Sequence, residues 1–177
     1  EGGALFTNDD DLALKMRAIR THGGIRRHYH DLVGMNGRFD TLQAAIMLGK
    51  WPGFADEVAA RERLGARYSQ NLADLCATPA IREGNTHVYA QYTLRVSNRD
   101  ALGETLKAKG IPTAVYYPKC LHEQPVFSDL GYKYGDFPAA EAASREVISL
   151  PLNPYLTQAE QDFVISGVRE ALATSKQ

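Results

Sequence analysis

The sequence predicts an α/β chain in two parts, 1–53 and 54–177, joined by a long interrupted helix. The first part contains a strand-like stretch, a helix, a glycine-rich loop and a second helix. The second part contains a strand, a helix and another strand in succession, which is a compact α+β arrangement. Trp51-Pro52-Gly53 interrupts the helix between the parts, because proline removes a helix hydrogen bond and clashes with the preceding turn.

The bulk composition excludes several classes of protein. Of the 177 residues, 44% are hydrophobic, which is enough for a buried core. Twenty basic and twenty-one acidic side chains leave a formal charge of −1, so neither nucleic acid nor an anionic membrane is predicted as a partner. No apolar run approaches the ~20 residues that span a bilayer, and no basic and apolar leader opens the chain. We therefore expect a soluble cytoplasmic protein.

Cysteine and histidine do not form a metal-binding pattern. Cys76 and Cys120 lie far apart without CxxC or Cys/His spacing, which argues against zinc and gives little reason to expect a disulfide. His22, His28 and His30 lie close together in the sequence, but a structural metal site also needs acidic or thiolate ligands at fixed spacing. That spacing is missing, so the sequence predicts a surface loop and no metal.

The first helix is predicted to run from a cap at Thr7 to about Thr21, after a short strand at 4–7. Acidic residues in its first turn and basic residues towards its end complement the helix dipole; they are Asp9, Asp10, Asp11, Arg17 and Arg20. The strand has no partner nearby in the sequence, and the chain does not begin with methionine. We therefore expect the chain to be cut from a longer protein.

Residues 22–35 form a glycine-rich loop without a core pattern, and the stretch from Arg26 to His30 consists of arginine, histidine and tyrosine. The guanidinium groups of arginine donate paired hydrogen bonds to phosphate groups, and aromatic rings stack on bases, so this loop could contact a nucleotide diphosphate. A solvated loop is the alternative. The residues alone leave both interpretations open.

The stretch 34–45 is predicted to be a loop that enters a helix. Asp40 is a good N-cap, and Gln43 follows three residues later, where a capping-box partner belongs. Asn36 and Arg38 flank a glycine just outside this helix N-terminus. Free backbone N–H groups, an amide and a guanidinium there would suit an oxyanion such as a phosphate. A solvated arginine and an asparagine in a turn are the ordinary alternative.

The second helical stretch, 55–75, carries an apolar stripe that we expect to be buried, formed by Leu64, Tyr68, Leu72 and Leu75. Glu57 and Arg61 have the spacing of an ion pair on the exposed face. We interpret Arg61, Arg63 and Arg67 as solubilising charges.

Residues 87–96 alternate apolar and polar side chains, which predicts a strand with one buried face. The following helix buries Leu102 and Leu106 and stops at Gly110. A further strand at 113–116 ends at a tyrosine pair, and a loop-rich segment follows. The remaining predicted elements are a helix from Pro138 to about Val147, an extended run at 148–152, and a last helix capped by Thr157 and Glu160 that buries Val164, Val168 and Leu172.

Three motifs occur in the order found in a known family: Glu1-Gly2-Gly3-Ala4-Leu5-Phe6-Thr7-Asn8-Asp9, residues 34–45, and Tyr116-Tyr117-Pro118-Lys119-Cys120-Leu121-His122. Over nearly the whole chain the sequence resembles the DegT/DnrJ/EryC1/StrS family of pyridoxal-phosphate-dependent nucleotide-sugar aminotransferases. Residues 87–93 and 149–156 are most similar to the branch that acts on UDP-linked 3-keto sugars in lipopolysaccharide and O-antigen biosynthesis.

This resemblance implies the C-terminal part of a fold-type-I transferase that binds pyridoxal 5'-phosphate. Residues 1–53 would be the end of the large domain, and 54–177 the linking helix with the small α+β domain. In the family, the lysine that binds the cofactor lies shortly before the strand that opens this chain, and the aspartate facing the pyridine nitrogen lies earlier. The lysines of this chain do not stand in that motif, so the chain alone is expected to be inactive; they are Lys15, Lys50, Lys107, Lys109, Lys119, Lys133 and Lys176.

The resemblance also implies site residues. Asn36 corresponds to an asparagine that reaches the cofactor phosphate of the neighbouring subunit, and Arg38 would lie close by. Tyr116 and Tyr117 match a His-Tyr pair that approaches the nucleotide sugar; the first member is tyrosine here, whereas Tyr117 keeps the match. Without the resemblance, two tyrosines at a strand end indicate packing or an interface. Further candidates for contact with the substrate are Arg26, Tyr29 and His122.

The implied activity is transfer of an amino group from glutamate to a keto group of a UDP-linked sugar by a homodimer with shared active sites. Two alternatives remain open. Some family members lack the lysine and dehydrate similar sugars. Alternatively, the chain is a stand-alone interaction module that ignores pyridoxal phosphate.

Overall fold

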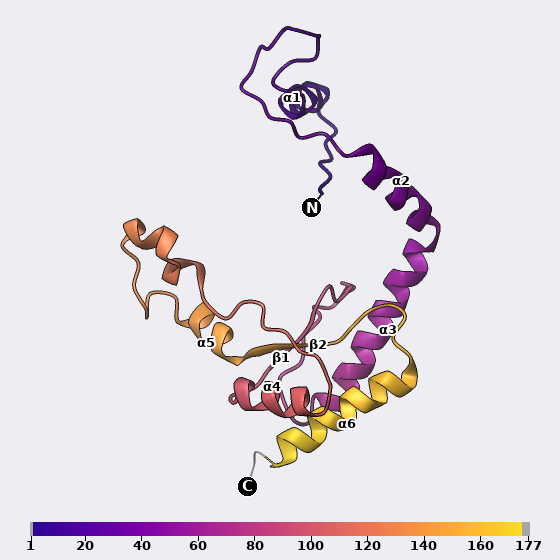
Figure 1. Ribbon diagram of the computed structural model, residues 1–177, viewed down its shortest axis with the longest axis vertical. Helices are drawn as coiled ribbons and strands as arrows, with labels where there is room; N and C mark the ends of the chain where they lie inside the picture. The colour runs from indigo at the N-terminus through magenta and orange to yellow at the C-terminus, as the bar shows by residue number, and fades with distance from the viewer. Residues whose placement is uncertain (1, 175–177) are drawn as a thin grey trace. The chain divides into compact units, whose positions relative to one another are not determined.

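The computed structural model describes residues 2–174 and divides the chain into two compact units, Glu1–Phe54 and Ala55–Gln177 (Figure 1). Unit 1 holds two helices and a long loop. Unit 2 holds a small sheet and the remaining helices. That unit 1 forms the end of a large cofactor-binding domain stays a prediction.

Helix α1 (Asp10–Arg20) begins later than predicted, because Asp9 rather than Thr7 is its cap. The carboxylate of Asp9 accepts a hydrogen bond from the Leu12 N–H at 3.0 Å. The hydroxyl of Thr7 accepts from the Asp9 N–H at 3.1 Å, so Thr7 supports the cap from outside the helix.

The predicted strand at 4–7 is wrong. These residues have irregular backbone, and the side chains of Leu5 and Phe6 are 79% and 92% exposed. A strand requires a hydrogen-bonded neighbour. Among residues 2–174, no strand or bridge pairs with this stretch.

The interrupted helix is confirmed. Pro52 lies in a single 3₁₀ turn, where its missing N–H costs no α-helical hydrogen bond. Next to it, the rings of Trp51 and Phe54 stack with their centroids 5.5 Å apart. The elements in order are α2 (Thr41–Lys50), η1 (Trp51–Gly53) and α3 (Phe54–Leu72).

Unit 2 is built on a two-stranded antiparallel sheet, β1 (Tyr92–Arg95) and β2 (Val147–Leu150). Isolated bridges extend it at both edges, between Ala77 and Arg95 and between Ala114 and Ser149. β2 therefore lies between β1 and Ala114. The sequence predicted only an extended run at 148–152, and the strand predicted at 113–116 is reduced to this one bridge.

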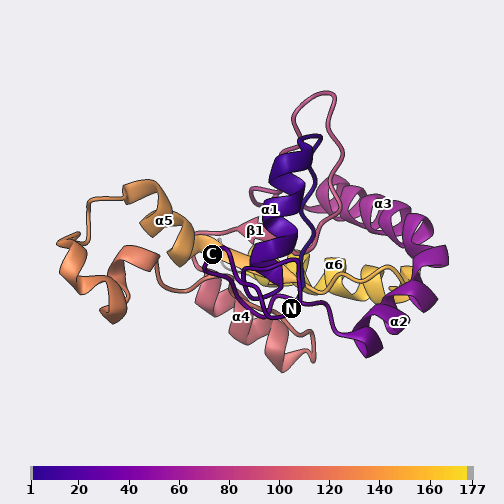
Figure 2. The ribbon, with the colours of Figure 1, turned by 90° about the horizontal axis from the view of Figure 1, so that it is seen from above.

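Three helices bury the core face of this sheet: α3, α4 (Arg99–Ala108) and α6 (Gln158–Thr174) (Figures 1 and 2). Their predicted core residues Leu64, Tyr68, Leu72, Leu102, Leu106, Val164 and Val168 are buried, whereas Leu75 and Leu172 are partly buried. On the opposite face, the hydroxyls of Thr93 and Ser149 share a hydrogen bond of 2.8 Å. The capping box of Thr157 and Glu160 is confirmed.

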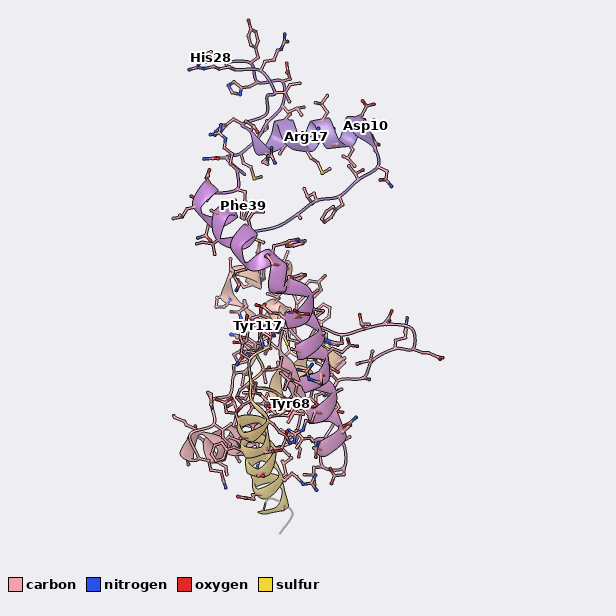
Figure 3. The ribbon with its side chains drawn as sticks, turned by 90° about the vertical axis from the view of Figure 1, so that its right-hand side faces the viewer. Asp10, Arg17, His28, Phe39, Tyr68 and Tyr117 are labelled. Atoms are coloured by element: carbon pink, nitrogen blue, oxygen red, sulfur yellow. The ribbon has the colours of Figure 1, made fainter. Side chains whose placement is uncertain are left out.

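Tyr68 is the central aromatic residue of this core (Figure 3). Its ring lies 4.9 Å from that of Tyr92, and its hydroxyl donates to the carbonyl of Pro151 at 2.9 Å. Burial raises the pKa of Tyr68, so the phenol stays neutral and serves as a hydrogen-bond donor.

The alternating pattern at 87–96 is confirmed only from Tyr92 onward. Val88 and Ala90 are exposed, and Tyr89 is buried instead. Tyr89 has a φ of +44°, a left-handed conformation that turns the chain before β1 begins. Its ring then packs on α3 at Gly65, where an added Cβ would lie 2.3 Å from the ring.

Two arginines of α3, Arg61 and Arg67, do more than solubilise the helix. Arg61 donates to the carbonyl of Tyr89 at 3.1 Å, which fixes the turn before β1. Arg67 donates to the Gln161 side chain at 3.0 Å and pairs with Asp162, both on α6.

The predicted pair of Glu57 with Arg61 does not form, because each has a partner distant in sequence. Glu57 accepts a hydrogen bond from the hydroxyl of Tyr155. Arg61 binds the backbone of Tyr89. The i, i+4 spacing indicated which residues share a helix face, but it could not show which other segment packs against that face.

Substituting Gly65→Ala is expected to lower the unfolding free energy of unit 2 by about 1–3 kcal/mol, although alanine is the better helix former. The new methyl group would meet the buried ring of Tyr89 at 2.3 Å. Gly103→Ala in α4 is the matched control, because its Cβ would meet Ile148 at an ordinary 3.6 Å. Urea unfolding followed by circular dichroism measures both variants. Equal stabilities for the two would contradict the packing described.

Candidate functional site

The loop 22–35 of unit 1 is closed against the end of α1. The last carbonyl groups of a helix have no partner within it. Here the carbonyl of Ile19 accepts from the Met35 N–H at 2.8 Å, and that of Arg20 accepts from the Gly37 N–H at 2.9 Å. The loop, which carries His28, therefore starts and ends at one fixed place (Figure 3).

Glycines make this closure possible. Gly23 has a φ of +83°, and its carbonyl accepts from the N–H groups of both Asp31 and Leu32 at 3.0 Å. A Cβ on Gly34 would lie 2.0 Å from the Gly23 nitrogen. The two backbones therefore touch, and a side chain at Gly34 cannot be accommodated unless the loop opens.

Asn36 lies at the neck of this loop. It forms an isolated antiparallel bridge with Thr21, directly after α1, and its neighbours Met35 and Gly37 donate to the α1 carbonyls. The side chains of Asn36 and Arg38 are exposed, and no hydrogen bond or ion pair within residues 2–174 engages either one. An amide and a guanidinium are thus presented to solvent from a well-anchored backbone.

Two of the N–H groups at the N-terminus of α2 are not free, whereas the sequence suggested that they were available. Asp40 is its cap, as predicted, and its carboxylate accepts from the N–H groups of Leu42 at 2.8 Å and Gln43 at 3.3 Å. These donors are occupied and a negative charge is added beside them. For a phosphate near α2, the side chains of Asn36 and Arg38 are therefore better candidates than these two N–H groups.

Arg26 and Tyr29 lie close together in the loop. This proximity is what contact with one common ligand would require. The guanidinium carbon of Arg26 is 5.1 Å from the ring centroid of Tyr29, within the range of a cation–π contact. Tyr29 is 62% exposed, so one side of the pair remains open to solvent.

Tyr116 and Tyr117 belong to unit 2 and follow the bridge at Ala114. They are 47% and 73% exposed, and their rings meet edge to face with the centroids 6.0 Å apart. Tyr117 is labelled in Figure 3. The peptide bond between them is cis. Both tyrosines are therefore presented at the surface of unit 2, where they can contact a substrate or an interface rather than the core.

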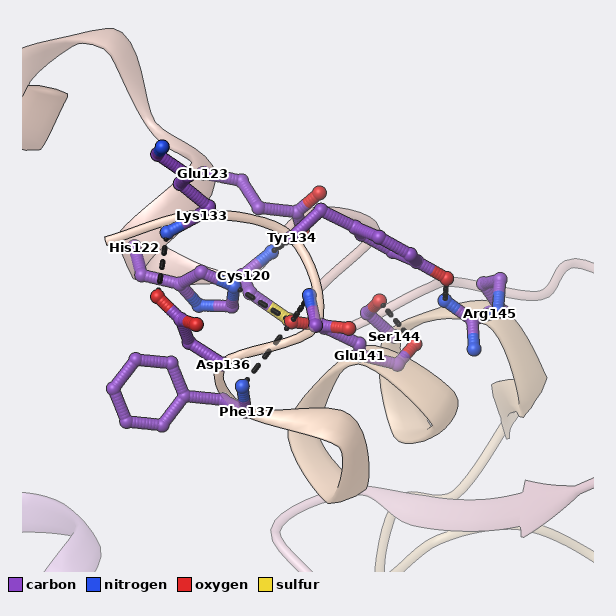
Figure 4. A network of polar contacts seen from close by, with 11 residues as sticks. Cys120, His122, Glu123, Lys133, Tyr134, Asp136, Phe137, Glu141, Ser144 and Arg145 are labelled. Atoms are coloured by element: carbon purple, nitrogen blue, oxygen red, sulfur yellow. Dashed lines mark hydrogen bonds and ion pairs between the residues drawn. The ribbon is translucent and has the colours of Figure 1, made fainter. Parts of the chain in front are cut away.

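His122 lies inside unit 2, where its ring forms a hydrogen bond with the carboxylate of Glu141 (Figure 4). Only 8% of the His122 side chain is exposed, and its Nε2 lies 3.0 Å from an oxygen of Glu141. The ring also lies 4.8 Å from that of Phe137. A substrate contact for His122 stays a prediction, but the structure gives this residue an internal partner.

Sequence reasoning missed Glu141, which lies in the first turn of α5 (Pro138–Glu146) and is 2% exposed. Burial by itself raises the pKa of its carboxyl, but the N–H groups of Gly135 and Phe137 and the ring of His122 outweigh burial and hold the pKa below its ordinary value. An acidic residue after a proline at a helix start is common, so no sequence signal marked this one as buried.

Other kinds of site are not evident in the described residues. Within 2–174, no three His, Cys, Asp or Glu side chains are arranged to hold a metal ion. In the same residues, no helix has the length and apolar character needed to cross a membrane. An open pocket of about 440 Å³ on unit 2, lined by residues from 77–79, 87–95 and Val147, contains none of the predicted site residues.

Substituting Gly34→Ala is expected to open the loop, so that hydrogen exchange of the Met35 and His22 amides becomes about tenfold faster or more. Gly37→Ala should leave exchange nearly unchanged, because the atoms nearest to its Cβ would be side-chain atoms of Arg20 at 3.4 Å and Met35 at 3.5 Å, at ordinary contact distances. Exchange measured by NMR or mass spectrometry compares the variants. If Gly34→Ala exchanged as slowly as the unsubstituted chain, the closure of this loop would be refuted.

Comparisons with known proteins place this geometry in a family. The chain matches the DegT/DnrJ/EryC1/StrS aminotransferase family over residues 1–169. It is 47% identical over 169 residues to the UDP-2-acetamido-2-deoxy-3-oxo-D-glucuronate aminotransferase of Pseudomonas aeruginosa, covering 95% of this chain and 46% of that protein. It is 44% identical over 174 residues to the pleiotropic regulatory protein of Geobacillus stearothermophilus, covering 96% and 47%.

Solved structures agree. A DegT/DnrJ/EryC1/StrS aminotransferase from Brucella abortus superposes with a TM-score of 0.87 at 39% identity, over 93% of this chain and 44% of that one. NtdA from Bacillus subtilis, solved with bound cofactor PMP, superposes with a TM-score of 0.79 at 27% identity, over 94% and 41%. The chain thus spans about half the length of these relatives. With a fold that matches the C-terminal part of a fold-type-I transferase, it belongs to the DegT/DnrJ/EryC1/StrS aminotransferase family.

Proposed function

We propose that this chain is the C-terminal part of a pyridoxal-phosphate-dependent enzyme that transfers an amino group from glutamate to a keto group of a nucleotide-linked sugar. The observation that carries the proposal is Asn36, an exposed amide beside Arg38 on a backbone anchored to α1, in a chain that belongs to this family. The relative from Pseudomonas aeruginosa favours a UDP-linked 3-keto sugar as the acceptor. We place the activity in bacterial surface polysaccharide biosynthesis, including lipopolysaccharide, in the cytoplasm.

The residues fit a phosphate group. Asn36 donates through its amide and Arg38 through its guanidinium, and the other described residues leave both side chains free. Bound pyridoxal phosphate supplies the electron sink and the amino-group carrier of transamination. In this proposal Asn36 and Arg38 hold the cofactor phosphate, and Asp40 keeps the start of α2 closed so that the two side chains remain in place.

The lysine that binds the cofactor is proposed to lie outside this chain. The lysines of this chain occupy ordinary structural positions: Lys15 and Lys107 lie within helices, and Lys109 pairs with Glu170 of α6. Lys176 lies outside the described residues. On this basis the chain alone should not catalyse transamination.

Each unit by itself carries residues that are proposed to contact the substrate. On unit 1, Arg26 and Tyr29 combine a positive charge with an exposed ring, which suits the diphosphate and base of a nucleotide sugar. On unit 2, the exposed hydroxyls of Tyr116 and Tyr117 suit the sugar. His122 belongs to the same segment of unit 2 as these tyrosines and is proposed to support them.

A homodimer with shared active sites is also proposed. Unit 1 buries almost none of its apolar side chains: Ala18 is its one hydrophobic residue that is buried among those described. Val33, Leu42 and Leu48 are 97%, 72% and 74% exposed. Apolar area of this extent on so small a unit favours contact with further protein. We propose that this contact involves the rest of a large domain and a second subunit.

Substituting Asn36→Ala in the full-length protein is expected to raise the Kd for pyridoxal phosphate by about tenfold to a hundredfold, the effect of losing one hydrogen bond to a charged group. Asn85→Ala, which changes an exposed asparagine of unit 2, should leave the Kd unchanged. Titration followed by cofactor absorbance measures both constants. An unchanged Kd in Asn36→Ala would remove Asn36 from the cofactor site.

Absorbance spectra of the full-length protein separate the enzyme from its alternatives. The aminotransferase should show the absorbance of bound cofactor, change its spectrum when glutamate is added, and recover the first spectrum with a UDP-linked 3-keto sugar. Bound cofactor without a response to glutamate would favour sugar dehydration. A protein without cofactor absorbance would be an interaction module.

A further inference from the structure

Residues 115–137, here called the connecting segment, lead from the sheet of unit 2 to α5. The segment contains η2 (Leu121–Glu123) and η3 (Pro125–Leu130). At its start, Ala114 and Ser149 exchange two main-chain hydrogen bonds of 3.1 and 2.7 Å. The segment therefore begins at β2.

The far part of the segment is anchored by Glu141. A single oxygen of this carboxylate, Oε1, accepts from the Gly135 N–H at 2.8 Å, the Phe137 N–H at 3.3 Å and the ring of His122 at 3.0 Å (Figure 4). Three donors on one buried oxygen require an acceptor with negative charge. The side chain of Glu141 thus holds η2 and the end of the segment together.

Both anchors belong to one continuous piece of chain. α5, which carries Glu141, runs directly into β2, which carries Ser149. The start of the connecting segment is bonded to this piece at Ser149, and the end of the segment is bonded to it at Glu141. Its geometry is therefore set by α5 and β2.

Tyr117 lies between the anchors and has few contacts of its own. It is 73% exposed, and in the described part of the chain its one ring contact is with Tyr116. His122 follows a short way along the chain, and Cys120 between them is tied to Glu123 through its N–H at 3.2 Å. A side chain with so few contacts is placed by its backbone, and that backbone is placed by the two anchors.

We propose that Glu141 is a positioning residue: through His122 and the N–H groups of Gly135 and Phe137, it holds the connecting segment so that Tyr117 meets the nucleotide sugar. This inference rests on the proposed function. Glu141 is buried and is not itself placed in contact with substrate, so its effect reaches the substrate through Tyr117.

The test uses Glu141→Gln in the full-length protein, since this substitution keeps the shape of the side chain and removes its charge. Exchange of the Gly135 and Phe137 amides should become about tenfold faster, as expected when a charge-assisted hydrogen bond is lost. The KM for the sugar should rise by about tenfold, whereas the reaction with glutamate alone should keep its rate. A variant that simply unfolds would lose both reactions.

The matched control is Glu160→Gln. Glu160 also accepts a main-chain N–H at a helix start, that of Thr157 at 2.8 Å, but it lies at α6 outside the connecting segment. Its substitution should leave the KM for the sugar and the exchange of Gly135 and Phe137 unchanged. A rise in KM equal to that of Glu141→Gln would show a general effect of lost carboxylates and overturn the proposal.

A double-mutant cycle gives a second measurement. Because Glu141 is proposed to act in part through His122, His122→Phe combined with Glu141→Gln should raise the KM no more than Glu141→Gln alone. Tyr117→Ala should raise the KM at least as much. Additive effects in the cycle, or an unchanged KM in Tyr117→Ala, would overturn the inference.

The failures can be told apart. If the unsubstituted protein does not react with glutamate, the proposed function fails. If it does react, and Glu141→Gln binds the sugar normally although Gly135 and Phe137 exchange faster, Glu141 is structural only and this inference alone fails.

Discussion

The main-chain hydrogen bonds of β2 are the constraint on which unit 2 depends. This four-residue strand pairs with β1 on one edge and with Ala114 on the other, so its backbone is held from both sides. Its buried side chains Ile148 and Leu150 meet the helices that form the core. Since α5 enters β2 without a loop, the direction of α5 follows from the sheet, and so does the place of Glu141. The sheet thus determines how the segment with the tyrosine pair leaves the core.

In unit 1 the backbone that carries candidate residues is also held in place, but without a comparable hydrophobic core. The structure of this unit depends on backbone hydrogen bonds at the end of α1, where the last carbonyls of the helix accept from the N–H groups of the residues on both sides of Asn36. Hydrogen bonds define this geometry locally, but each contributes only about 0.5–1.5 kcal/mol net in water. Burial of apolar area is the larger source of stability. The apolar side chains of unit 1 are largely exposed, so apolar burial within this unit contributes little to its stability.

Local signals were the ones that sequence reasoning could use. Asp40 as a cap, the break at Pro52 and the capping box of Thr157 and Glu160 each depend on neighbours within a few residues, and each is found. Contacts between distant segments were not predictable. Tyr89 is buried because Gly65, far earlier in the chain, leaves room for its ring, and no periodic pattern contains that information. The candidate site shows the same division. Asn36 was proposed from its place before a helix and from the family motif, and it stays a prediction, whereas the donors to Glu141 come from a segment that the sequence showed only as loop.

Exposed functional side chains and anchored backbones are two aspects of one arrangement. A side chain that binds a ligand must keep its donors free, so neighbouring residues of the same chain cannot hold it by those donors. Its position must then come from the backbone, and each group of candidate residues lies beside main-chain hydrogen bonds: Asn36 between two bonds to α1, and Tyr117 between the bridge at Ala114 and the carboxylate of Glu141. A buried carboxylate is well suited to this task because it accepts several N–H groups at once. Glu141 therefore anchors the connecting segment by accepting its N–H groups, just as the last carbonyls of α1 anchor the backbone on both sides of Asn36.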